Sequence, residues 1–154
     1  MNVADKPWSK RRAVARGVVA GDIPTLLRSL GSSSKGAKES AASVAELLDV
    51  ARNAGIEAAR KTAQLIPLCH PLPESVLDVR FDVRPSGITI EATAEVVAPT
   101  GVEMEALTAC LFSALSLVSR LGTTASVAVD DVVLWEKSGG RSGHWLREQA
   151  LAVR

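Results

Sequence analysis

The sequence is poor in aromatic residues and in cysteine, and neither sign of charge prevails. Aromatic residues make up 3% of the 154 residues and hydrophobic residues 47%, so the core must consist mainly of Ala, Val, Leu and Ile. The two cysteines, Cys69 and Cys110, are too few for a disulfide framework or a structural zinc site. The formal net charge of +1 gives no general attraction for nucleic acid or anionic lipid. Any anion site must therefore be local.

The sequence also contains no uninterrupted apolar run long enough to cross a membrane. Such a run needs about 18 residues, and polar or charged residues break every apolar stretch before that length. The opening residues, MNVADKPWSK, lack the charged and then apolar order of a leader peptide. We therefore expect a soluble, cytoplasmic protein with no membrane partner.

The length suits one domain. We expect a flexible N-terminal arm over residues 1–10, a single α+β domain over 11–145 and a C-terminal tail over 146–154. Early in the domain, Val14, Arg16 and Val18 alternate and predict a short strand. A short helix should follow from a cap at Asp22 to a stop at Gly31. Residues 32–43, SSSKGAKESAAS, have the composition of a loop.

Two capping boxes of the form Ser/Thr-x-x-Glu mark longer helices. The first, SVAE at residues 43–46, opens a helix that should run toward Leu65 and that a proline prevents from continuing. The second, TGVE at residues 100–103, opens an apolar helix that should end at Gly122.

The strand pattern completes the predicted fold. Residues 77–83 and 88–96 alternate apolar and polar side chains around the turn PSG, which predicts a hairpin. A last strand is predicted over residues 126–135, SVAVDDVVLW. This order favours an α+β, ferredoxin-like fold, a split βαβ arrangement with helices on one face of a mainly antiparallel sheet.

The corner LIPLCHPLP, residues 65–73, contains one of the two histidines of the chain. An imidazole can donate or accept a proton at neutral pH, and it can equally serve as a hydrogen-bonded corner residue. The residues alone leave both interpretations of His70 open. A metal site at Cys69 and His70 is less favoured, because adjacent residues seldom point at one ion and no second ligand cluster is visible.

Two further stretches could carry chemistry. Glu103 and Glu105 lie in the first turn of a predicted helix, where its dipole favours carboxylates. Residues two apart point to different faces, so one of these glutamates should face a neighbour or a pocket. The segment EKSGGRSG brings Lys137 and Arg141 together with glycines, a composition suited to phosphate but also to a mobile tail.

Three stretches together resemble one family, the cyclic pyranopterin monophosphate synthases, also called molybdenum cofactor biosynthesis protein C. These are ARNAGIEAARKTAQLIPLCHPL, PTGVEMEALTA and EKSGGRSG, and the resemblance covers residues 11–145. It implies a lyase of molybdenum cofactor biosynthesis that needs no cofactor or metal. The reaction converts a cyclic dihydroguanosine triphosphate into cyclic pyranopterin monophosphate and releases pyrophosphate. The resemblance also implies a homohexamer, a trimer of dimers with active sites at the dimer interface.

The same resemblance assigns roles to individual residues. Cys69 and His70 should line the substrate pocket, with His70 catalytic. The other wall and the phosphate-binding positions should come from Glu103, Met104, Glu105, Arg11 and Lys137.

The family's Lys-Gly-Asp, whose lysine is catalytic, corresponds best to Lys35 and Gly36 followed by alanine. This alignment needs an insertion of about nine residues before Ser43, longer than a typical loop change. Without an insertion, Val44 falls on the lysine position.

One departure concerns the reacting centre. The family has an aspartate and, three residues later, a lysine near the end of the last helix, where this chain has Ser119 and Gly122. Two hypotheses follow. The chain is a working synthase, or it is a catalytically impaired paralogue that binds a pterin or nucleotide or joins a true synthase in mixed oligomers.

Overall fold

A computed structural model describes residues 7–31, 37–122, 127–141 and 143–148, with residues 29–31 and 37–43 described by their backbone alone. The elements in chain order are β1 (Ser9–Ala20), α1 (Ile23–Gly31), α2 (Ala37–Arg60), α3 (Thr62–Leu65), β2 (Val76–Arg84), β3 (Gly87–Ala98), α4 (Glu103–Leu121), β4 (Ala128–Ser138) and β5 (Trp145–Leu146).

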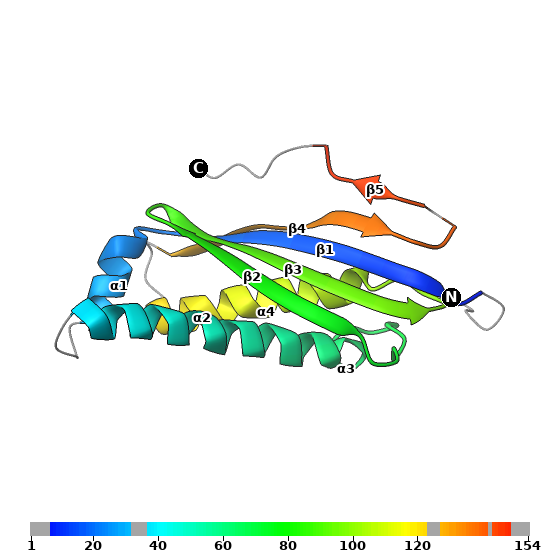
Figure 1. Cartoon of the computed structure of the whole chain (residues 1–154), viewed down its shortest axis with the longest axis horizontal. Coiled ribbons are helices and arrows are strands. Elements are labelled where there is room, and N and C mark those ends of the chain that lie inside the picture. The colour runs from blue at the N-terminus through cyan, green and yellow to red at the C-terminus, as the bar shows by residue number, and fades with distance from the viewer. Residues whose placement is uncertain (1–6, 32–36, 123–126, 142, 149–154) are drawn as a thin grey trace.

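The strands form one sheet in the order β2-β3-β1-β4-β5, and each neighbouring pair is antiparallel. Strand β3 lies between β1 and β2, so β1, α2 and β2 form the split βαβ unit that the sequence predicts. Helices α2 and α4 lie side by side on one face of the sheet (Figure 1). The α+β, ferredoxin-like prediction is therefore confirmed.

Small aliphatic side chains fill the space between the sheet and the two long helices. The inward positions of β3 alternate from Ile88 to Ala98 and are buried. Opposite them, α4 contributes Ala106, Ala109 and Ala114, each at most 1% exposed. None of the aromatic side chains in the described ranges is fully buried. A core without large rings lets helices and sheet approach closely.

Helices α2 and α4 approach each other closely at Gly55. A Cβ atom added there would lie 2.1 Å from Ser113 Oγ and 2.5 Å from the Ala109 carbonyl oxygen. The second atom belongs to the backbone of α4, so it cannot turn aside as a side chain would. Glycine at this position therefore sets the distance between the two helices.

We expect Gly55→Ala to lower the free energy of unfolding by about 1–3 kcal/mol, the usual cost of overpacking a tight core. The measurement is urea denaturation followed by circular dichroism. Asn53→Ala, at an exposed position of the same helix, is the matched control and should change stability by less than about 0.5 kcal/mol. Equal stability of Gly55→Ala and the parent would contradict this account of helix packing.

Helix α1 begins as predicted. The backbone N–H of Thr25 donates to Asp22 Oδ1 at 3.2 Å, and hydrogen bonding to Thr25 lowers the pKa of Asp22. Helix α2 differs, because it begins at Ala37 and the box at residues 43–46 lies inside it. The loop prediction for residues 37–43 is thus wrong. Alanine, lysine and glutamate in this stretch favour a helix, and the serines masked that preference.

The predicted cap of α4 is also wrong. The helix begins at Glu103, and its N-cap, Val102, makes no side-chain capping hydrogen bond. The Glu103 carboxylate reaches Lys137 Nζ at 3.2 Å instead of returning to Thr100. The predicted stop is confirmed, since Gly122 has φ 107° and its N–H donates to the Val118 carbonyl oxygen.

The strand boundaries differ in small ways from the predicted ones. Strand β1 already begins at Ser9, inside the expected arm, and β4 continues to Ser138. No sequence pattern predicted β5, where Trp145 pairs with Lys137 and Leu146 with Glu136. Two residues are too short a run for a periodic pattern.

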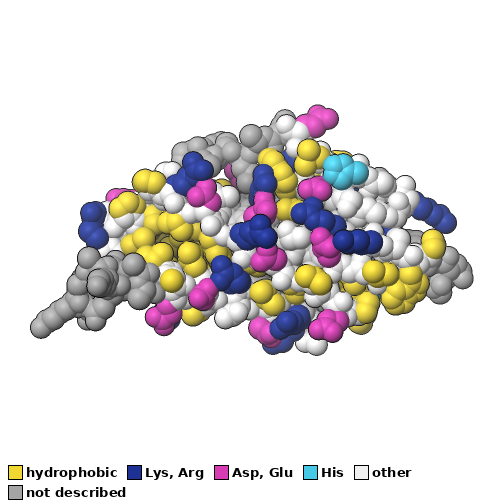
Figure 2. Space-filling model, in the orientation of Figure 1, with side chains coloured by type: hydrophobic (Ala, Val, Ile, Leu, Met, Phe, Trp, Pro, Cys, Tyr) yellow, Lys and Arg dark blue, Asp and Glu magenta, His cyan; other side chains and the backbone are white. Residues whose placement is uncertain are grey.

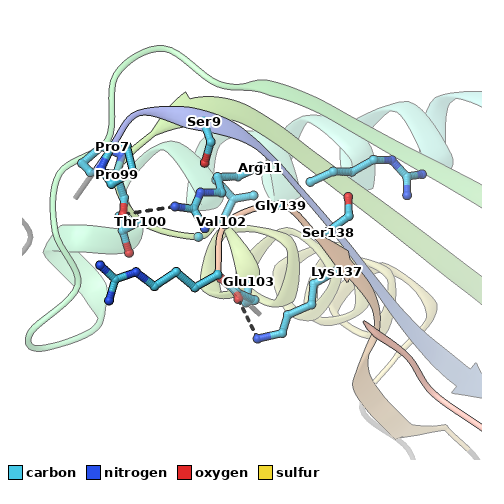
Figure 3. Close-up of a pocket in the computed structure, with 14 residues that line it drawn as sticks. Pro7, Ser9, Arg11, Pro99, Thr100, Val102, Glu103, Lys137, Ser138 and Gly139 are labelled. Carbon is cyan, nitrogen blue, oxygen red and sulfur yellow. Dashed lines mark hydrogen bonds and ion pairs between the residues drawn. The ribbon is translucent and has the colours of Figure 1, made fainter. Parts of the chain in front are cut away.

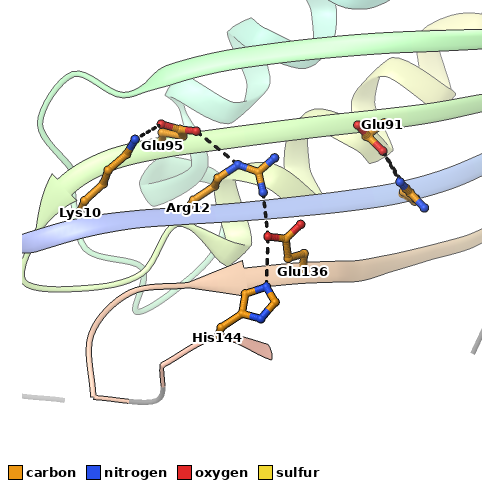
Figure 4. Close-up of polar contacts among 7 residues, drawn as sticks. Lys10, Arg12, Glu91, Glu95, Glu136 and His144 are labelled. Atoms are coloured by element: carbon orange, nitrogen blue, oxygen red, sulfur yellow. Dashed lines mark hydrogen bonds and ion pairs between the residues drawn. The ribbon is translucent and has the colours of Figure 1, made fainter. Parts of the chain in front are cut away.

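Charged side chains cover the sheet face that the helices leave open, with both signs interspersed (Figure 2). Arg12 lies between Glu95 and Glu136, at 3.3 and 3.0 Å, and Glu136 also contacts His144 at 3.3 Å (Figure 4). Burial alone would raise the pKa of Glu136, yet the hydrogen bonds and charges of Arg12 and His144 hold it below its ordinary value. Arg12 is thus a neutralised cation.

Helix α4 is long and apolar enough to cross a membrane by length and composition, with a mean hydropathy of 1.4. Half of this apolar stretch of α4 is buried within the fold, where the helix packs on α2 and the sheet. Its exposed side still carries Leu111, Phe112 and Leu115, which are 39%, 36% and 47% exposed. Burial in the core explains the apolar residues on one side of α4. No described element covers the apolar residues on its other side.

Candidate active site

Three adjoining cavities lie where β1 begins, β3 ends and α4 begins. We call them the basic cavity, of about 580 Å³, the histidine cavity, of about 350 Å³, and the rear cavity, of about 370 Å³. Glu103 lines both the basic and the histidine cavity. His70 and Glu105 line both the histidine and the rear cavity. The histidine cavity therefore shares walls with the other two and lies between them.

The basic cavity is lined by cations from separate elements: Arg11 and Arg12 from β1, Lys137 from β4, and Arg141 from the glycine-rich turn after β4. Figure 3 shows Arg11 and Lys137 in this lining. Arg11 donates to the carbonyl oxygens of Ala98 and Pro99, both at 3.4 Å. These weak contacts hold the guanidinium in place, and no carboxylate of the described residues forms an ion pair with it. Lys137, by contrast, is paired with Glu103.

The glycine-rich turn is shaped by its contact with Arg11. Gly139 and Gly140 have φ of 98° and 68°, conformations that other residues rarely adopt. A Cβ on Gly140 would lie 1.5 Å from Arg11 Nη1, so only glycine lets the guanidinium rest against the turn. The described residues of the segment EKSGGRSG thus line a cavity together with Arg11, and phosphate binding by this segment stays a prediction.

Ser9 belongs to this cavity although sequence reasoning did not select it. Its Oγ is buried and has no hydrogen-bond partner within the described part of the chain. A lone hydroxyl in a cavity of cations can donate to an anion oxygen. The signal was weak, because Ser9 lies in the segment expected to be a flexible arm.

The corner after α3 presents Cys69 and His70 to the histidine cavity. Helix α3 ends where the Ile66 N–H donates to the Thr62 carbonyl oxygen, and the Cys69 N–H then donates to Ile66. Between them, Leu68 adopts φ 67° and is 97% exposed. This left-handed residue turns the chain so that His70 is exposed beside Glu105 in the lining of two cavities.

Two acidic groups of the histidine cavity, Glu105 and Cys69, have raised pKa values, which favours their protonated forms. Burial raises the pKa of Glu105, which is 7% exposed, and the charge of Glu103 raises it further. Burial also raises the pKa of Cys69, and the Glu105 charge adds to this effect. The Cys69 thiol is therefore a poor nucleophile at neutral pH. His70 and Glu105 are the groups best placed for proton transfer.

Seven of the expected site residues thus line adjoining cavities, and their roles stay predictions: Arg11, Cys69, His70, Glu103, Met104, Glu105 and Lys137. Lys35, the eighth, lies outside the described residues. In the described ranges, no group of three or more His, Cys, Asp and Glu side chains is placed to hold a metal ion.

The altered positions lie at the other end of the molecule. Ser119 and Gly122 are at the C-terminal end of α4, and Ser119 lies about 24 Å along the helix axis from Glu103. Ala37, two residues after Lys35 in the sequence, begins α2, whose length of 24 residues corresponds to about 36 Å. The corner that holds His70 follows the opposite end of α2 (Figure 1).

The sequence matches the MoaC family over residues 1–140. It is 45% identical to the cyclic pyranopterin monophosphate synthase of Thermomicrobium roseum over 96% of this chain and 86% of that protein. Proteins of the same name from Desulfitobacterium hafniense and Chloroflexus aggregans are 39% and 42% identical. These two alignments cover 98% and 97% of this chain, and 89% and 88% of the respective relatives. With its fold and the residues of its three cavities, the chain belongs to the MoaC family.

Proposed function

We propose that the protein converts a cyclic dihydroguanosine triphosphate into cyclic pyranopterin monophosphate, with release of pyrophosphate, as a cytoplasmic lyase of molybdenum cofactor biosynthesis. One observation carries the proposal. A cavity rich in cations shares Glu103 with a cavity that contains His70 and Glu105. A triphosphate and the reacting part of the same molecule could therefore bind in adjoining spaces.

The chemistry needs both kinds of group. When the cyclic phosphate closes, a substrate oxygen bonds to the innermost phosphorus and the bond to pyrophosphate breaks. Arg11 and Lys137 would hold the phosphate oxygens and stabilise the charge that develops on the leaving pyrophosphate. His70 and Glu105 would move protons to and from the ring system and the attacking oxygen. Cys69 and Met104 would pack against the substrate.

The test is incubation of the purified protein with the cyclic triphosphate, with pyrophosphate and the pterin product measured separately. Formation of both products in equal amounts supports the proposal. If neither forms at high enzyme concentration, the synthase proposal fails and the impaired-paralogue hypothesis takes its place. The names and extents of similarity of the relatives do not favour that alternative; the observation behind it is the Ser119 and Gly122 pair.

We further propose that each site is completed by a second copy of the chain, within a hexamer built as a trimer of dimers. The Ser119–Gly122 pair and Ala37, which follows Lys35 by two residues in the sequence, are each separated from the His70 end of the subunit by most of a long helix, too far to serve His70 in the same subunit. A copy related by a two-fold axis could bring the beginning of its own α2, which Lys35 precedes in the sequence, to this pocket.

Helix α4 offers a surface for that copy. Met104, Leu111 and Leu115 are 38%, 39% and 47% exposed, and their spacing places them on one stripe that continues to Gly122. Antiparallel packing of two such stripes about a two-fold axis would put Met104 of one subunit beside Ser119 and Gly122 of the other. The exposed Leu68 at the rim of the histidine cavity fits the same arrangement.

Restoring the family pair should increase turnover if Ser119 and Gly122 limit the reaction. We expect Ser119→Asp with Gly122→Lys to release pyrophosphate about ten-fold faster or more, since one acid–base group commonly contributes 10²–10⁴-fold. A lysine at Gly122 must adopt φ 107°, so we also expect a loss of about 1 kcal/mol in stability. Steady-state pyrophosphate release is measured for both single variants and the double variant. A folded double variant no faster than the parent would contradict this explanation.

A further inference from the structure

We propose that Glu103 is an exchangeable counter-ion of Lys137. It pairs with the lysine in the free site, yields it to the phosphate groups of the substrate, and returns when pyrophosphate leaves. The inference rests on the proposed function, because it assigns the basic cavity to the phosphates. It adds a role for Glu103 in setting how tightly that cavity holds pyrophosphate.

The contact is an ion pair between distant elements. Lys137 Nζ, on β4, lies 3.2 Å from Oε1 of Glu103, the first residue of α4 (Figure 3). Both side chains are about one third exposed, at 31% and 32%, inside a cavity that both of them line. A pair with this much solvent contact is weak, so a stronger anion can displace the carboxylate.

Gly101 provides the place where this carboxylate rests. A Cβ atom at Gly101 would lie 1.9 Å from Glu103 Oε2 and 2.6 Å from its Cδ. The backbone of Gly101 does not have the positive φ that requires glycine. Glycine is therefore needed here for space, and a methyl group would push the carboxylate away from this position without straining the main chain.

The released carboxylate has another favourable position. Glu103 lies in the first turn of α4, where the N-cap makes no side-chain hydrogen bond and the helix dipole attracts a negative charge. Opening the pair therefore moves the carboxylate between two favourable positions and does not leave it isolated. This keeps the exchange reversible.

The other cations of the cavity explain why the exchange matters. Arg12 is held by Glu95 and Glu136 on the open face of the sheet, whereas the hydrogen bonds of Arg11 within the described ranges go to carbonyl oxygens. Among the described residues, Lys137 is thus the cavity cation that forms an ion pair with a carboxylate of the cavity itself. Pyrophosphate carries more charge than one carboxylate and displaces it, and Glu103 then competes for the lysine as the product leaves.

The test is isothermal titration of the full-length protein with pyrophosphate. We expect Glu103→Gln and Gly101→Ala to bind pyrophosphate about three- to five-fold more tightly than the parent, the range that one partly exposed ion pair supports. Lys137→Met should bind it more weakly. Glu91→Gln is the matched control, because it removes the same charge from an ion pair with Arg16 on the open sheet face and should leave the affinity unchanged.

The outcomes separate this inference from the proposed function. If Lys137→Met weakens binding but Glu103→Gln and Gly101→Ala bind no more tightly than the parent, the counter-ion role is wrong and the phosphate cavity stands. If none of the five proteins binds pyrophosphate, both are wrong. Inhibition of turnover by added pyrophosphate should strengthen in Glu103→Gln in proportion to its affinity. Structural damage would weaken binding, so tighter binding cannot come from a misfolded variant.

Discussion

His70→Ala should lower the rate of pyrophosphate release by about 10²- to 10⁴-fold, the usual contribution of a general acid or base. His70 is exposed, lines two adjoining cavities with Glu105, and follows a left-handed Leu68 that turns the corner toward them. Burial raises the pKa of Glu105, which favours its neutral form beside the imidazole, so the two groups can act as a pair. Single-turnover measurements at saturating substrate isolate this step from binding.

The chain supplies its own control for this substitution. His144, the only other histidine, contacts Glu136 on the open face of the sheet and lines none of the three cavities. We expect His144→Ala to keep turnover within about two-fold of the parent, as for most surface substitutions. Pyrophosphate affinity should not change in His70→Ala, because that residue does not line the basic cavity. A His70→Ala rate within ten-fold of the parent would remove His70 from the chemistry.

Local pattern was sufficient for most of the fold. Alternation over β2 and β3 predicted the hairpin, because one face of that hairpin packs on the helices and the other meets solvent. Asp22 and Gly122 marked the start of α1 and the end of α4 through backbone chemistry that acts within one turn. Such features depend on residues close in the sequence, which is why they can be recognised without the structure.

The errors occurred where distant residues decide the outcome. The box at residues 100–103 has the right spacing for a cap, but Glu103 pairs with Lys137, 34 residues further along the chain. Strand β5 forms because two residues pair with the edge of β4 that faces away from β1. The early start of α2 is a different error, in which serine-rich composition outweighed the helix preference of the intervening residues.

The sequence indicated residues of the candidate site but not how they are arranged. Motif resemblance selected His70, Glu105 and Lys137, and the fold brings them to one end of the molecule. The sequence could not indicate that the hydroxyl of Ser9 is buried without a partner, or that two carboxylates neutralise Arg12. Both facts depend on packing between strands that are far apart in the chain.

The separation of the two ends leads to the prediction with the clearest contrast. Mixed oligomers of His70→Ala and Lys35→Ala should recover about one quarter of the parent activity, although each variant alone is nearly inactive. In the proposed composite site, His70 comes from one subunit and Lys35 from its neighbour. With random pairing of subunits, one site out of four contains both an intact His70 and an intact Lys35. Co-expression with two affinity tags, followed by purification on both and a mass measurement by light scattering, provides the mixed oligomers.

A second pairing makes the result specific to this geometry. Mixed oligomers of His70→Ala and Lys137→Met should recover no activity, because these two residues line neighbouring cavities of the same subunit and no subunit carries both intact. If a site were contained in one subunit, neither mixture would recover activity. If subunits merely stabilised each other, both mixtures would recover it to the same extent. Recovery with Lys35→Ala and not with Lys137→Met is therefore the outcome that only a site built from opposite ends of two subunits explains.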